Sequence, residues 1–132
     1  MAAILVIDDD DAVRKLIAMI LERAHHRAVE ADDGIKGLKA FKAEAFDLVI
    51  TDLIMPEKEG LETIRELRKD GGKVRILAIS GGFPGNPIDI LDMARSLGAD
   101  AALGKPFTPD SLLAEVDRLL APPPPDAGAQ FC

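Results

Sequence analysis

The chain has 132 residues, of which 48% are apolar and 30% are charged, so a single domain with a packed core is expected. Sixteen basic and 23 acidic residues give a net charge of −7, which argues against nucleic-acid or anionic-membrane partners because both need a basic surface. The lone cysteine, Cys132, excludes a disulfide framework, and since neither a bilayer-spanning apolar run nor a signal peptide is recognisable, we expect a cytoplasmic chain.

Short apolar runs alternate strictly with stretches in which apolar residues recur at helical spacing, with arginine and glutamate opposite them. In chain order we predict a strand at 4–7, a helix at 11–24, a strand at 27–31, a helix from Asp32 or Asp33 to about Ala45, a strand at 47–51, a helix at 60–69, a strand at 75–79, a helix at 87–97, a strand at 101–103 and a helix at 109–120. This alternation predicts an α/β fold in which a parallel sheet is covered by helices on both faces.

The end of the chain has a different composition. Residues 122–132 contain consecutive prolines and show neither a helical nor a strand pattern. We therefore predict one domain over residues 1–121 and a Pro-rich, disordered tail over residues 122–132.

Chemically informative side chains follow four of the predicted strands. Asp8 and Asp9 follow the first, Asp52 the third, Ser80 the fourth and Lys105 the fifth. A single aspartate after a strand is most often a cap or turn residue, but ligands of open parallel sheets bind beyond the carboxyl ends of the strands. Their co-occurrence at four strand ends therefore predicts a site.

Three aspartates at one rim repel each other, so at least one is expected to keep its proton to higher pH than a free aspartate. A divalent cation such as Mg²⁺ and the ammonium group of Lys105 would relieve this repulsion. Together with the hydroxyl of Ser80, these groups suit an incoming phosphoryl group, with a carboxylate as the nucleophile that forms an acyl phosphate.

Four motifs resemble those of the receiver domain of bacterial two-component response regulators, including the chemotaxis type. They are ILVIDDD at 4–10, DLVITDLIMP at 47–56, ILAISGG at 76–82 and GKPF at 104–107, and the match extends from residue 3 to about 120. The resemblance implies a flavodoxin-like, doubly wound sheet of five parallel strands in the order 2-1-3-4-5, with five helices.

The resemblance also implies roles for individual residues. Asp52 would accept the phosphoryl group. Mg²⁺ would be held by Asp9, by Asp8 directly or through water, by Asp52 and by the backbone carbonyl of Ile54. The phosphoryl group would contact Lys105 and Ser80, and Pro106 would fix the loop through a cis peptide bond.

Four positions bear on departures from the family pattern. Ala102 stands where the family usually has a switch aromatic, so coupling through that position is in doubt. Phe83, in the stretch GGFPGNP, either covers the edge of the core or moves when Asp52 is phosphorylated. The positions thought to orient the hydrolytic water are Ile54 and Gly82, whose side chains cannot hydrogen-bond a water, so self-dephosphorylation is expected to be slow.

The expected function is two-component signal transduction by a stand-alone receiver. It would accept a phosphoryl group from a histidine kinase or a histidine phosphotransfer protein and switch an output protein that binds the face built from residues 87–97, 101–103 and 109–120. No enzymatic activity is expected beyond self-phosphorylation and slow self-dephosphorylation. The alternatives are the receiver part of a hybrid histidine kinase or longer response regulator, a degenerate receiver, a two-metal nuclease, and a Mg²⁺ phosphatase with an aspartate nucleophile, although Ile54 stands where such a phosphatase usually has its acid.

Overall fold

The computed structural model describes residues 2–52, 60–71, 74–80 and 98–121. In chain order its elements are β1 (Ala3–Ile7), α1 (Asp11–Arg23), β2 (Arg27–Ala31), α2 (Gly34–Ala43), β3 (Leu48–Asp52), α3 (Gly60–Gly71), β4 (Arg75–Ser80), β5 (Ala101–Gly104) and α5 (Pro109–Leu120). All five predicted strands and four of the predicted helices are confirmed to within about two residues at their ends. The helix predicted at 87–97 and the tail at 122–132 lie outside the described residues.

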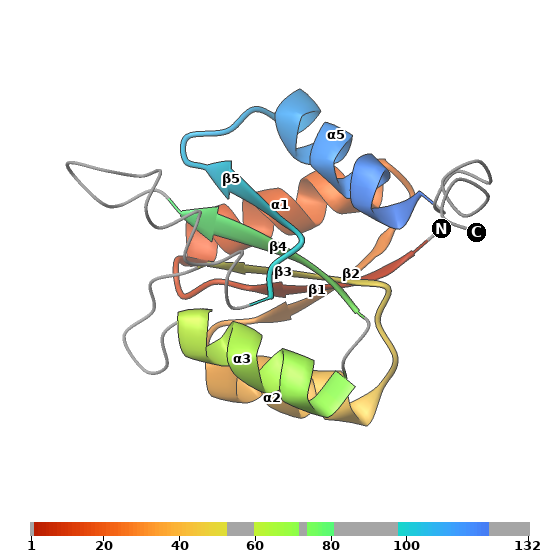
Figure 1. Ribbon diagram of the computed structural model, residues 1–132. Helices are drawn as coiled ribbons and strands as arrows, with labels where there is room; N and C mark the ends of the chain where they lie inside the picture. The colour runs from red at the N-terminus through yellow and green to blue at the C-terminus, as the bar shows by residue number, and fades with distance from the viewer. Residues whose placement is uncertain (1, 53–59, 72–73, 81–97, 122–132) are drawn as a thin grey trace, which may run out of the picture.

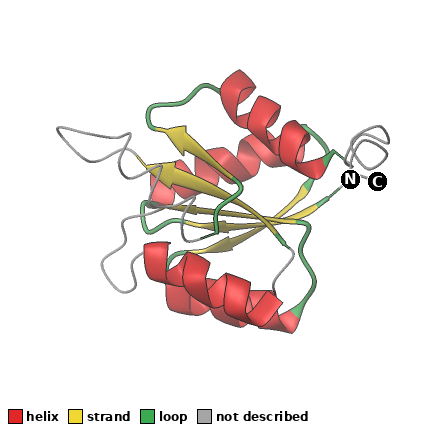
Figure 2. Ribbon diagram, viewed as in Figure 1, coloured by secondary structure: helices red, strands yellow, loops and turns green. Residues whose placement is uncertain are grey.

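The strands form one parallel sheet in the order β2-β1-β3-β4-β5. Helices α1 and α5 cover one face of this sheet, and α2 and α3 cover the other (Figures 1 and 2). The predicted doubly wound α/β fold and its strand order are therefore confirmed. Because the strands are parallel, their carboxyl ends lie along the same rim of the sheet.

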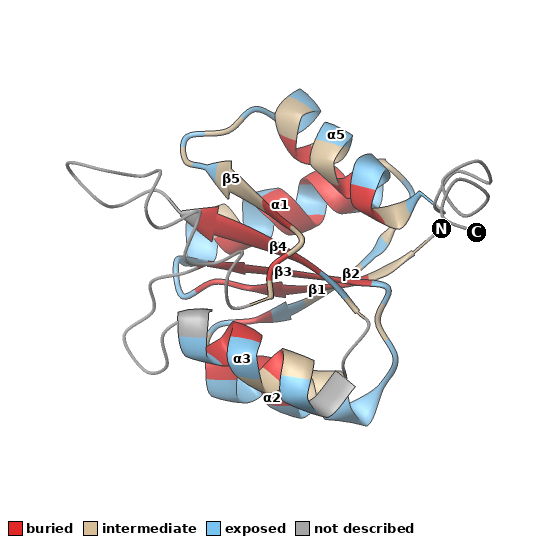
Figure 3. Cartoon of the chain, in the orientation of Figure 1, coloured by how far each residue is buried: buried red, intermediate tan, exposed pale blue. Residues whose placement is uncertain are grey.

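The alternation of side chains along the central strands divides the core into two layers. Leu5 and Ile7 of β1 face α2 and α3 in a cluster that includes Ile64 and Leu67. Ile4 and Val6 face the other way, into the cluster that contains buried residues of α1 and α5. Both faces of β1 and β3 are thus buried, which explains why these strands read as nearly continuous apolar runs (Figure 3).

Side-chain caps fix where the helices begin. Asp10 accepts hydrogen bonds from the backbone N–H groups of Ala12 and Val13 at the start of α1. Of the two caps considered for α2, Asp33 is the one that accepts a backbone hydrogen bond, from the N–H of Lys36. Asp32 instead pairs with the ammonium of Lys36 at 3.0 Å. No helix in the described part of the chain is long and apolar enough to cross a membrane.

The segment that leads into β5 is tied to α3 by one arginine. Arg68 donates from Nε to the carbonyl of Gly98 at 2.8 Å and from Nη2 to Asp100 at 2.6 Å. Asp100 in turn accepts the backbone N–H of Ile76 in β4 at 2.8 Å. Gly98 has a φ of 121°, and a Cβ atom there would lie 2.7 Å from Cγ of Arg68. This position therefore needs glycine for both its backbone conformation and its close neighbour.

Candidate functional site

Three aspartates meet at the carboxyl rim of the sheet. Asp8 and Asp9 directly follow β1, and Asp52 is the last residue of β3, its neighbour in the sheet. Each offers a carboxylate oxygen, and these three atoms lie within 4.8 Å of one another. Asp8 and Asp52 are buried, whereas Asp9 is exposed. A hard divalent cation fits this donor set because it would bind carboxylate oxygens on the protein side and keep water on the open side.

Lys105 joins the cluster from the loop after β5. Its Nζ atom lies 3.3 Å from Oδ2 of Asp8 and 3.2 Å from Oδ2 of Asp52. The lysine side chain is 21% exposed, against 2% for Asp8 and 9% for Asp52, so the two ion pairs are largely shielded from solvent. The Lys105–Pro106 peptide bond is cis, as the resemblance implies.

Burial and the charges of this cluster together shift the pKa of two groups away from their usual values. Burial is the main cause that raises the pKa of Asp8, and the neighbouring carboxylate of Asp52 raises it further. The N–H of Asp10 and the charge of Lys105 lower this pKa, but they do not cancel the rise. The pKa of Lys105 is lowered by burial, but its attraction to Asp52 and Asp8 outweighs burial and leaves this pKa raised. One aspartate therefore holds its proton more tightly than usual, as expected, although burial rather than repulsion is the larger cause.

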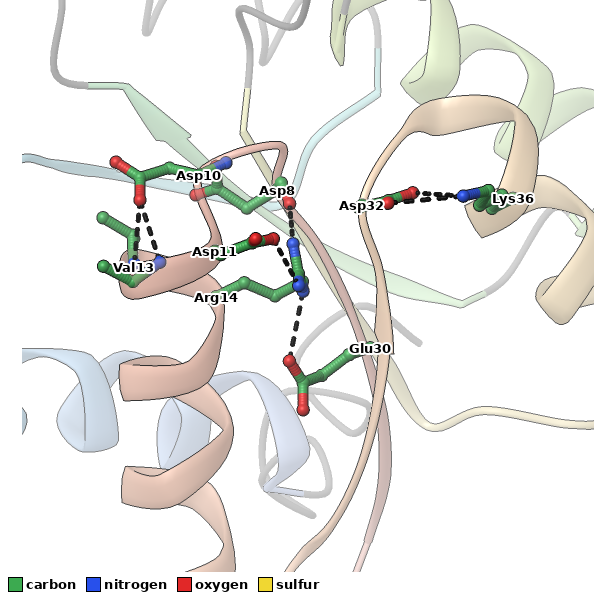
Figure 4. A network of polar contacts seen from close by, with 9 residues as sticks. Asp8, Asp10, Asp11, Val13, Arg14, Glu30, Asp32 and Lys36 are labelled. Carbon is green, nitrogen blue, oxygen red and sulfur yellow. Dashed lines mark hydrogen bonds and ion pairs between the residues drawn. The ribbon is translucent and has the colours of Figure 1, made fainter.

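Asp8 is held in place through both its backbone and its side chain. Its N–H donates to the carbonyl of Ala31 in β2 at 3.1 Å, and its Oδ1 accepts the N–H of Asp10 at 2.9 Å. Its own carbonyl accepts a hydrogen bond from Nη1 of Arg14 at 2.9 Å (Figure 4). The site is thus braced by the first turn of α1 and by the edge strand β2.

Sequence reasoning missed Arg14. Helical periodicity places the arginines of the first helix on the face opposite the apolar residues, yet Arg14 is only 8% exposed. Its hydrogen-bond partner Glu30 belongs to β2, so the burial of Arg14 depends on how that strand lies beside the helix. A helical pattern in one segment does not contain this information.

The remaining predicted site residues are only partly placed by the structure. Ser80 is the last residue of β4 and pairs with Gly104 of β5, so its backbone lies at the same rim. Ala102 lies in β5 and packs, half-buried, against the core layer on the side of α2 and α3. Ile54, Gly82 and Phe83 lie outside the described residues.

Comparisons with known proteins agree with this geometry. A family model described as the response regulator receiver domain matches residues 4–117. Response regulator MprA of Mycolicibacterium vanbaalenii is 35% identical over 126 residues, which cover 96% of this chain and 53% of that protein. Transcriptional regulatory protein ResD of Bacillus subtilis is 31% identical over 117 residues, covering 89% of this chain and 47% of the relative. The chain therefore spans about half the length of these curated relatives.

Two solved structures show the same arrangement over most of their length. The chemotaxis protein CheY4 of Vibrio cholerae has a TM-score of 0.83 and 29% identity, covering 91% of this chain and 99% of that one. The receiver domain of NtrX from Brucella abortus also has a TM-score of 0.83, with 31% identity, covering 89% of this chain and 97% of that one.

Proposed function

The chain belongs to the response regulator receiver domain family, and from this premise we propose that Asp52 accepts a phosphoryl group in the presence of Mg²⁺. The observation that carries the proposal is the position of Lys105, whose ammonium lies 3.2 Å from Asp52 and 3.3 Å from Asp8. A cation placed between a nucleophilic carboxylate and a metal-binding carboxylate can neutralise charge that arrives with a phosphoryl group.

The proposed metal ligands are the carboxylates of Asp8, Asp9 and Asp52, with the backbone carbonyl of Ile54 added by the family resemblance. Support comes from the proximity of the three carboxylates, and from the pKa of Asp8, which is raised mainly by burial and further by the neighbouring carboxylate of Asp52. When bound, Mg²⁺ would supply charge neutralisation at the phosphoryl oxygens.

In the proposed reaction, a carboxylate oxygen of Asp52 attacks the phosphorus atom of a phosphohistidine. The new O–P bond forms as the P–N bond breaks, and the imidazole nitrogen keeps the electron pair of that bond. Lys105 stabilises the negative charge of the transferred group through its Nζ protons. Ser80, at the end of β4, is the proposed hydroxyl donor to one phosphoryl oxygen.

We further propose that the chain turns over no external substrate and that its acyl phosphate is lost slowly, because Ile54 and Gly82 offer no polar side chain to a water. The proposed donor is a histidine kinase or a histidine phosphotransfer protein. The proposed output is a protein that binds the face formed by residues 87–97, β5 and α5. The cytoplasmic location and the lack of nucleic-acid or membrane partners stay predictions.

A mass measurement tests the proposal. The wild type and Asp52→Ala would be incubated with Mg²⁺ and acetyl phosphate, and Asp117→Ala, an exposed aspartate of α5, serves as the matched control. We expect one phosphoryl group on the wild type and on Asp117→Ala, and none on Asp52→Ala or after removal of Mg²⁺ by EDTA. A phosphoryl group on Asp52→Ala would contradict the assignment of Asp52, and multiple turnover of a phosphate ester would favour the phosphatase alternative.

A further inference from the structure

We propose that Arg14 is a positioning residue that holds the turn of residues 8–11 in the shape that binds the metal ion. The inference rests on the proposed function, because it concerns the same Mg²⁺ site. It goes beyond that function by assigning a role to a residue that would touch neither the metal nor the phosphoryl group.

The guanidinium of Arg14 uses its three nitrogen atoms on three different partners. Nη1 donates to the carbonyl of Asp8 at 2.9 Å, and Nη2 lies 2.6 Å from Oδ1 of Asp11. Nε donates to Oε1 of Glu30 in β2 at 3.1 Å. Figure 4 shows these contacts converging on one side chain between α1 and β2. Arg14 therefore ties the first and last residues of the turn to each other and to a strand of the sheet.

Fixing the carbonyl of Asp8 also constrains Asp9. That carbonyl and the N–H of Asp9 belong to one planar peptide unit, so the hydrogen bond from Arg14 limits rotation of the plane that leads into Asp9. On the far side of Asp9, the N–H of Asp10 is held by Oδ1 of Asp8 at 2.9 Å. The exposed carboxylate of Asp9 thus extends from a backbone that is pinned on both sides.

The charges around Arg14 explain how its guanidinium can lie close to a site that binds a metal cation. The side chain of Arg14 is 10% exposed, and its charge is paired with Asp11 and Glu30. Asp11 and Glu30 thereby offset most of the repulsion that Arg14 would exert on a divalent metal. The three donor directions require arginine, because a lysine has a single nitrogen atom and cannot reach all three acceptors.

The test compares Arg14→Lys with a matched control elsewhere in the sheet. Arg27 at the start of β2 makes a similar pair with Glu44, at 2.6 Å, so Arg27→Lys removes an arginine–glutamate contact without touching the turn. Isothermal titration calorimetry would measure Mg²⁺ binding at a temperature where each variant is shown to be folded. We expect Arg14→Lys to weaken Mg²⁺ binding about tenfold, because losing a hydrogen bond to a metal-binding residue has an effect of this size at other metal sites. Arg27→Lys should bind Mg²⁺ within about twofold of the wild type.

A kinetic measurement separates positioning from a direct role. Phosphorylation by acetyl phosphate would be followed as a function of Mg²⁺ concentration. For Arg14→Lys we expect the half-saturating Mg²⁺ concentration to rise about tenfold while the maximal rate stays within about twofold of the wild type. A fall in the maximal rate alone would overturn the positioning role.

Two further measurements distinguish failure of the inference from failure of the proposed function. If the wild type binds Mg²⁺ and neither Arg14→Lys nor Glu30→Ala weakens that binding, the role of Arg14 is wrong while the proposed function stands. If the wild type binds no Mg²⁺, the proposed function fails, and the metal role of Arg14 fails with it.

Amide hydrogen exchange without metal gives an independent readout, since Arg14→Lys should speed exchange at Asp10 about tenfold. Unchanged exchange at Asp10 would contradict the proposal that Arg14 holds the turn in place.

Discussion

Nζ of Lys105 lies 3.2 Å from Oδ2 of Asp52, although 53 residues separate the two in the sequence. Asp52 ends β3 and Lys105 follows β5, with β4 between them in the sheet. The lysine side chain must therefore reach past the end of β4, where Ser80 lies. The same ammonium is 3.3 Å from Asp8, so one cation connects the ends of three strands.

The first prediction concerns this shared cation. Lys105→Met keeps the length of the side chain but leaves the buried carboxylates of Asp8 and Asp52 facing each other without an ammonium. In EDTA we expect the free energy of unfolding to fall by about 2 kcal/mol, and Mg²⁺ to restore most of that loss. Urea unfolding with and without Mg²⁺ measures both values. An equal loss in the two conditions would show that Lys105 does not share its charge with the metal ligands.

Asp8→Asn is predicted to stabilise the metal-free protein at neutral pH. The pKa of Asp8 is raised in the folded state, so this group favours folding at pH values below its ordinary pKa, and that contribution is lost as the pH rises through the raised pKa. Asparagine cannot ionise, yet its Oδ1 can still accept the N–H of Asp10. We expect the variant to exceed the wild type by about 1 kcal/mol at pH 7, with a smaller difference at acid pH.

Asp32→Asn is the control of opposite sign. Its hydrogen bond with Lys36 lowers the pKa of Asp32, so the ionised form is favoured in the folded protein. The loss of this exposed pair should lower stability slightly at neutral pH and not at acid pH. Chemical unfolding in metal-free buffer over a pH series compares the two variants. If Asp8→Asn is less stable than the wild type at every pH, the charge of Asp8 does not destabilise the metal-free protein.

Gly98→Ala tests the connection between α3 and β5. The φ of 121° is unfavourable for alanine, and the new Cβ would lie 2.7 Å from Cγ of Arg68, whose position is fixed by its bonds to Gly98 and Asp100. We expect the free energy of unfolding to fall by about 2 kcal/mol. Thermal and urea unfolding measure this loss. The folded variant should still be phosphorylated at the wild-type rate, because Gly98 precedes the amino end of β5, whereas Asp8, Asp9 and Asp52 lie at the opposite, carboxyl rim of the sheet.

The lifetime of the acyl phosphate tests the expectation for Ile54 and Gly82. We expect the wild type to keep its phosphoryl group for much longer than seconds after the donor is removed. Gly82→Asn adds a polar side chain that could hold a water and should shorten this lifetime. The decay is followed by intact mass at fixed Mg²⁺ concentration. A wild-type lifetime of seconds would show that another group orients the water.

Strand positions could be predicted from local patterns, and the meeting of the acidic residues with Lys105 could be predicted from the order of the strands and helices. The apolar runs around Leu5 and Val49 are long enough to mark buried strands, and strict alternation with helices implies that the strands are parallel. In a parallel sheet, residues that follow successive strands share one rim, so Asp8, Asp52 and Lys105 could be grouped without knowing any distance.

Other features depend on contacts between segments and could not be predicted. The choice between Asp32 and Asp33 as the cap of α2 turns on a single hydrogen bond to the N–H of Lys36. The main cause of the raised pKa of Asp8 is its burial, which is set by the elements packed around it. The burial of Arg14 likewise follows from where Glu30 lies, because helical spacing alone assigns the arginine to the polar face.

Lys105 follows β5, an edge strand of the sheet that is synthesised after β1 and β3. During translation, Asp8, Asp9 and Asp52 are therefore made before β5 and Lys105. A nascent polypeptide at that stage holds the acids without their ammonium. The site therefore gains its ammonium only once β5 has been made and has joined the sheet, so a chain that stalls before residue 105 presents three carboxylates without the amine that pairs with two of them.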